Sequence, residues 1–160
     1  MSLLEIKTNI ANSYAELGRM EQSMQLCRDV YAGHLKLNGE EHPSTLSEAN
    51  NYADCLLHLS RFEEAKALMR KTIPMARRVF GEHNVCTIRM RMVYLRALVT
   101  DPGATLDDLR KAVTTGEDSQ RTTRRVYGSE HPLTVRVEQL LRESRAVLRA
   151  RETPSPGGSA

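Results

Sequence analysis

A short phrase occurs three times in this chain at nearly constant spacing. It reads Gly-Glu-Glu-His-Pro-Ser-Thr-Leu over residues 39–46, and related segments occupy residues 81–88 and 128–135. Gly39 and Gly81 are 42 residues apart, as are Thr45 and Thr87. Self-similarity at a fixed period of tens of residues predicts a repeat architecture, in which each unit buries its apolar face against its neighbours.

The segments between these phrases are predicted to be pairs of helices, because apolar residues recur in them at steps of three and four. The first stripe, which we expect to be the packed face of its helix, is formed by Leu3, Ile6, Ile10, Tyr14 and Leu17. The whole chain is predicted to contain about seven helices. Three pairs form units of about 3–42, 43–84 and 85–131, and a capping helix covers 132–150. The repeat domain thus covers 1–150, and 151–160 is predicted to be a disordered tail.

The third unit is longer than the others. The alignment of its second helix with that of the second unit predicts two extra residues in the turn and three in or near the helix, where Gly116 is a candidate local break. Three residues are almost one helical turn, so the apolar stripe can stay in phase.

Composition narrows the class of protein. The net charge is +3, hydrophobic residues make up 40% and aromatic residues 4% of the chain, and no run of 18 apolar residues is present. This predicts a helical core of aliphatic residues and no membrane span. The three cysteines have no paired short spacing, so we expect a reduced, cytoplasmic setting.

Two stretches carry a family resemblance. Residues 9–23 and 51–65 resemble tetratricopeptide repeats, with small residues at Ala11, Ala53 and Ala65 and a turn glycine at Gly18, whose place Ser60 takes in the second unit. The period of 42 and the linker phrase are similar to the kinesin light chain type of repeat. The resemblance implies an all-α fold, an α–α superhelix of the right-handed tetratricopeptide-type solenoid.

The same resemblance implies a non-enzymatic scaffold that binds a partner peptide in a concave groove lined by the first helix of each unit. Asparagine suits such a groove because its amide both donates and accepts hydrogen bonds, and arginine favours an acidic segment of the partner. The resemblance implies that asparagines at the places of Asn9 and Asn51 hold the peptide. The predicted groove residues are Asn9, Asn12, Asn50, Asn51, Asp54, Arg89, Arg96 and Arg136.

Other interpretations remain open. The chain could be a self-assembly module or a fragment of a longer array without its own peptide site, since residues 2–6 take the place of residues 44–48 in the repeat. The basic C-terminal helix leaves RNA binding as a third alternative, although helical-repeat RNA readers usually have another repeat length. His42 and His131 lie in different units and are expected to cap helices, so no metal site is predicted. No motif of an enzyme or a cofactor site is present.

Overall fold

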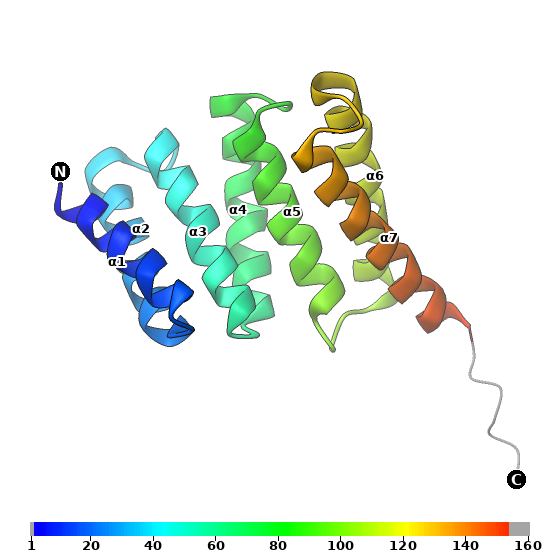
Figure 1. Ribbon diagram of the computed structural model, residues 1–160, viewed down its shortest axis with the longest axis horizontal. Helices are drawn as coiled ribbons and strands as arrows, with labels where there is room; N and C mark the ends of the chain where they lie inside the picture. The colour runs from blue at the N-terminus through cyan, green and yellow to red at the C-terminus, as the bar shows by residue number, and fades with distance from the viewer. Residues whose placement is uncertain (1, 154–160) are drawn as a thin grey trace, which may run out of the picture. The chain divides into compact units, whose positions relative to one another are not determined.

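The computed structural model describes residues 2–153, and these form helices joined by short loops, without strands. The helices are α1 (Leu3–Glu16), α2 (Met20–Asn38), α3 (Pro43–His58), α4 (Phe62–Phe80), α5 (Val85–Thr100), α6 (Leu106–Tyr127) and α7 (Pro132–Glu152). Figure 1 shows their order along the chain. The all-α repeat fold predicted from the sequence is confirmed. Within residues 2–153, no helix has the length and apolarity that crossing a membrane requires.

The chain divides into two compact units, residues 1–97 and 98–160. In the first, helices that are neighbours in sequence pack on one another: α1 on α2, α2 on α3 and α3 on α4. In Figure 1, α1, α3 and α5 lie nearer the viewer, with α2 and α4 behind them. The first helices of consecutive pairs therefore share one side here, and the bounds of the predicted repeat units stay a prediction.

The core of the first unit combines small and large apolar side chains. Ala11, Ala53 and Ala65 are fully buried, as expected for places where helices approach closely, and Leu56 and Met69 fill the space between them. Because a methyl side chain is small, these alanines allow the backbones of consecutive helices to approach one another closely.

The face of α1 that packs is not the one that the sequence pattern predicts. Leu3, Ile6, Ile10 and Leu17 are exposed, with 67%, 38%, 43% and 71% of their surface accessible. The helix instead packs through Ala11 and through Leu4, whose side chain lies so close to α2 that a Cβ on Gly33 would stand 2.7 Å from it. The predicted packed stripe is therefore an exposed apolar face.

The second unit contains α6, which packs on α7. The turn before α6 has five residues where the corresponding turns have three, and α6 has 22 residues where α2 and α4 have 19, as predicted. The alternative of a local break at Gly116 is wrong, because the helix continues through this buried glycine. The insertion thus adds a turn to an unbroken helix.

The last helix extends to Glu152, two residues beyond its predicted end at 150. The remainder of the predicted disordered tail, residues 154–160, lies outside the described residues.

Candidate functional site

The repeated phrase positions the first helix of each unit through a glycine and a side-chain cap. Gly39, Gly81 and Gly128 have φ of 85°, 91° and 89° with ψ of 175°, 160° and 165°. This backbone region is essentially restricted to glycine, because a side chain there would clash with the backbone. Glycine in all three copies is therefore a steric requirement of the turn.

The residue three places after each glycine caps the following helix. Nδ1 of His42 accepts a hydrogen bond from the backbone N–H of Ser44 at 3.2 Å, and His131 does the same for Leu133 at 3.1 Å. In the middle copy, Oδ1 of Asn84 accepts from the backbone N–H of Cys86 at 2.8 Å. The predicted capping role of the two histidines is confirmed. Among residues 2–153, no three His, Cys, Asp or Glu side chains are arranged to hold a metal ion.

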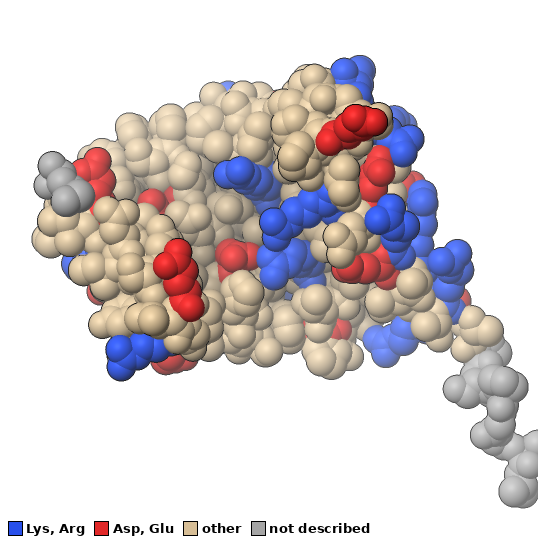
Figure 2. All heavy atoms as spheres, in the orientation of Figure 1, with Lys and Arg blue, Asp and Glu red and all other residues tan. Residues whose placement is uncertain are grey.

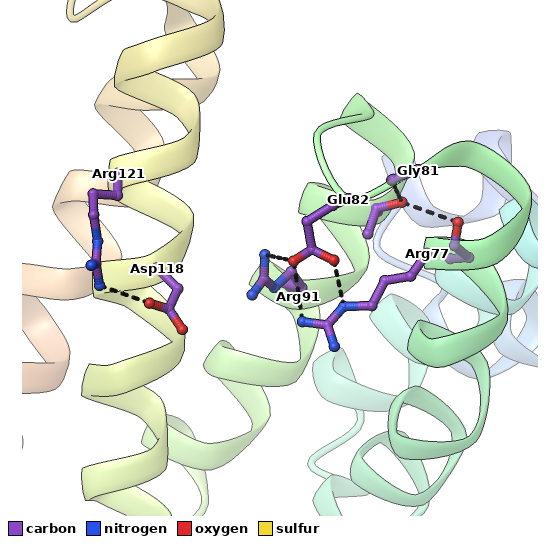
Figure 3. A network of polar contacts seen from close by, with 8 residues as sticks. Arg77, Gly81, Glu82, Arg91, Asp118 and Arg121 are labelled. Carbon is purple, nitrogen blue, oxygen red and sulfur yellow. Dashed lines mark hydrogen bonds and ion pairs between the residues drawn. The ribbon is translucent and has the colours of Figure 1, made fainter.

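Ion pairs attach two of these phrases to the same helix, α4. Lys71 on α4 donates to Glu40 at 2.6 Å. Figure 3 shows a different arrangement at the next phrase, where Glu82 lies between Arg77 of the preceding helix and the buried Arg91 of the following one, at 2.8 and 2.9 Å. Because one carboxylate accepts hydrogen bonds from a guanidinium group on each of the two helices, it holds the linker between α4 and α5 in place.

The predicted groove residues on α1 and α3 present amide groups at repeat-equivalent positions. Asn9, Asn12 and Asn51 are exposed, and Asn9 and Asn51 are 42 positions apart in the sequence. Asn51 donates through Nδ2 to Glu48 at 3.2 Å, which leaves its Oδ1 to accept. Asn50 differs from them, because its Oδ1 is buried and has no hydrogen-bond partner within residues 2–153.

Asp54 and Arg96 form a charge pair between equivalent positions of α3 and α5. Nη1 of Arg96 donates to Oδ1 of Asp54 at 2.7 Å, and Nε2 of His58 lies 3.5 Å from the other carboxylate oxygen. The side chains of Arg96 and Asp54 are 26% and 40% exposed, so solvent and a ligand can both reach the pair. We define the polar face as Asn9, Asn12, Asn51, Asp54 and Arg96.

The two other predicted arginines take no part in this ion pair. Arg89 on α5 is exposed and makes no ion pair within residues 2–153, so its guanidinium remains accessible. Arg136 is an exposed residue of α7 and belongs to the second unit. Its assignment to the groove stays a prediction.

In Figure 2, Lys and Arg side chains gather over α5 to α7 with acidic side chains among them, and the viewed face is hollowed over α3, between α1 and α5. In the second unit, several arginines are paired: Arg124 with Glu138 at 2.5 Å, and Arg145 with Glu117 at 2.8 Å. The hydrogen bond from Arg124 lowers the pKa of Glu138. These pairs neutralise part of the positive charge on which the RNA-binding alternative depends.

The sequence pattern missed a contact between two cysteines. Sγ of Cys55 on α3 donates to Sγ of Cys27 on α2 at 3.3 Å, and both residues are buried. The two cysteines are 28 positions apart, and only their helical phase, which places both on packed stripes, could have suggested the contact.

Comparisons with known proteins agree with this geometry. Residues 2–78 match the family model described as tetratricopeptide repeat. No curated protein sequence matches the chain. The structure is similar to that of BtubC (BKLC) from P. vanneervenii, with a TM-score of 0.50 and 18% identity over 99% of this chain and 68% of that one. It is also similar to a Podosopora anserina protein of nearly identical TPR-like repeats, assigned to the kinesin light chains, with a TM-score of 0.55 and 16% identity over 94% and 97% of the two chains.

The matched residues contain α1 to α3 and most of α4, which are two of the helix pairs. Residues 2–78 thus match the tetratricopeptide-repeat model, and the chain shares its all-α repeat fold with these two solved structures.

Proposed function

We propose that the chain is a non-enzymatic binding module whose polar face holds an extended peptide segment of a partner protein. The observation that carries this proposal is the recurrence of exposed amides at equivalent positions of α1 and α3, beside the Asp54–Arg96 pair. An amide donates and accepts, so it can bind the backbone of an extended peptide whatever the side chains of that peptide are.

Helix propensity supports a role for these asparagines outside folding. Asparagine in a helix interior is less favourable than alanine by up to about 0.7 kcal/mol. Asn9 and Asn51 lie in the interiors of α1 and α3 and are exposed, so no burial compensates for this cost. Their recurrence at the period of the repeat is therefore consistent with selection for binding.

The charge pair favours an acidic residue in the bound peptide. A carboxylate of the peptide can compete with Asp54 for the guanidinium of Arg96, and the accessible Arg89 on the same helix adds positive charge. Charge-assisted bonds to arginine are the stronger class of hydrogen bond, so an acidic side chain fits this part of the face better than a neutral one.

A peptide array followed by fluorescence anisotropy tests the proposal. For peptides that bind, Asn9→Ala and Asn51→Ala should each weaken affinity about 3- to 10-fold, as expected for the loss of one net hydrogen bond. Arg96→Ala should weaken acidic peptides more than neutral ones. Asn38→Ala, which removes an exposed amide from the end of α2, is the matched control. Affinities within about twofold of the original for all three face variants would exclude this binding mode.

A second function is supported by the exposed apolar face of α1. Leu3, Ile6, Ile10 and Leu17 follow one another at steps of three, four and seven residues, a spacing that packs helix on helix. Self-assembly through this face would be lost in Ile6→Lys or Ile10→Lys, whereas the peptide affinities would not change. Light scattering over a dilution series that shows one constant molecular mass would rule out assembly.

A further inference from the structure

Cys27 and Cys55 form a buried dithiol at the contact between consecutive repeats. Cys27 belongs to the second helix of the first pair and Cys55 to the first helix of the next, and their sulfur atoms are 3.3 Å apart. The two residues are 6% and 8% exposed. The hydroxyl of Ser23 lies 3.6 Å from the sulfur of Cys55. Three groups capable of hydrogen bonding therefore meet inside an otherwise apolar contact.

We propose that Cys27 and Cys55 are a site of reversible disulfide formation by an oxidant of the peroxide class, which covalently joins α2 to α3. A disulfide requires sulfur atoms about 2.05 Å apart, so the existing contact needs to shorten by about 1.2 Å. Sulfur atoms already in contact across a helix pair need little movement of the side chains to reach bonding distance.

The environment makes Cys55 the nucleophile of the pair. When Cys55 ionises, the hydrogen bond reverses: the Cys27 thiol donates to the Cys55 thiolate, as the Ser23 hydroxyl can, while burial opposes ionisation, and the net effect lowers the pKa of Cys55 to about 7. The same hydrogen bond and burial raise the pKa of Cys27, which therefore remains a thiol. Thiolates, and not thiols, attack peroxide, so the first step takes place at Cys55.

The reaction balances with one molecule of hydrogen peroxide. The thiolate of Cys55 attacks one peroxide oxygen, the O–O bond breaks, and the departing hydroxide takes the proton that Cys55 released on ionisation and becomes water. The sulfenic acid left on Cys55 is then attacked by the sulfur of Cys27, the S–O bond breaks, and the second hydroxide leaves as water with the proton of Cys27. Two thiols are oxidised, and the peroxide is reduced to two molecules of water.

The bond would connect two repeats at a position next to the polar face, because Asp54 directly precedes Cys55. It closes a loop from residue 27 to residue 55, which restricts the unfolded chain more than the folded one. We therefore expect oxidation to raise the melting temperature by roughly 10 °C.

The test uses the Cys86→Ser variant, which removes the half-buried third cysteine as a source of bonds between chains. After peroxide treatment, thiol titration in denaturant should find both remaining thiols lost, and peptide mapping should find residues 27 and 55 linked with a mass decrease of about 2 Da. The melting temperature should rise and return to its starting value after dithiothreitol.

Two further variants control for side effects of the oxidant. Cys27→Ala and Cys55→Ala, each combined with Cys86→Ser, should fold without the temperature rise, because neither can form the bond. Two thiols that remain free after treatment, or a mass gain from sulfinic acid at either cysteine, would overturn the proposal.

Discussion

Ser60 lies in the turn between α3 and α4 in a backbone conformation that favours glycine. Its replacement by glycine therefore tests what this conformation costs the stability of the protein. Its φ is 57°, and it is the one residue other than glycine with positive φ among those described. The turn is closed by hydrogen bonds from Ser60 N–H to Leu57 O at 3.0 Å and from Arg61 N–H to Leu56 O at 2.9 Å. These two bonds define a Schellman motif, whose usual residue at this position is glycine.

The magnitude follows from two opposing effects. A left-handed conformation costs a residue with a side chain about 1–2 kcal/mol, which Ser60→Gly would remove. Glycine also gains freedom in the unfolded chain, which costs about 0.4–1 kcal/mol. Since Ser60 is exposed, its side chain contributes no buried surface. The net expectation is a stabilisation of about 1 kcal/mol, or a rise of about 2–4 °C in melting temperature.

Thermal and urea unfolding followed by far-UV circular dichroism would measure this effect. The first repeat supplies an internal comparison, because Gly18 has φ of 72° and its turn is closed by the equivalent bonds from Gly18 N–H to Ala15 O and from Arg19 N–H to Tyr14 O, so Gly18→Ser should destabilise by a similar amount. Ser47→Gly is the matched control, because Ser47 is exposed within α3 and should lose about 0.5 kcal/mol to helix propensity. The reasoning is refuted if Ser60→Gly and Ser47→Gly change stability in the same direction.

Three other predictions follow from the linkers and the thiols. Gly81→Ala should destabilise the protein by about 1–3 kcal/mol in urea unfolding, since its backbone region excludes side chains; an unchanged midpoint would contradict this. His42→Ala should lose about 1 kcal/mol, whereas His42→Asn should be close to neutral because Asn84 makes the same cap in the next phrase. Cys55 has a folded pKa of about 7 against an ordinary value of 9.0, so its contribution to stability is present above pH 9.0 and lost as the pH falls through 7. Urea midpoints should therefore rise with pH across this range and lose that increment in Cys55→Ala, while the raised pKa of Cys27 acts in the opposite direction at higher pH.

The helices and their limits were predictable because their signals are local. Each linker glycine and its capping residue lie within four positions of one another, so the phrase alone predicts where α3, α5 and α7 begin. The longer turn and the longer α6 followed from counting residues. The alternative of a break at Gly116 is not realised, because one buried glycine in a 22-residue helix costs only about 1 kcal/mol relative to alanine.

Contacts between helices were less predictable. Large apolar residues dominate a periodicity pattern, but α1 packs through Ala11 and through Leu4 against Gly33, a close approach that depends on small residues. The Asp54–Arg96 pair joins residues 42 positions apart, and nothing in either residue's neighbourhood signals its partner. The amides of the polar face were predicted from the family resemblance, and their binding role awaits experiment.

The capped linkers also have a consequence for the order of folding. Their hydrogen bonds span two to six residues, from Leu133 to His131 and from Thr134 to the carbonyl of Gly128, so a linker can close before distant segments meet. Two of the helix pairs that they join, α2 with α3 and α6 with α7, likewise pack on one another. A topology of such short-range contacts folds quickly, because little loop-closure entropy is lost before contacts form. Each phrase can therefore act as an independent starting point for folding, from which helix pairs grow outward in both directions along the chain.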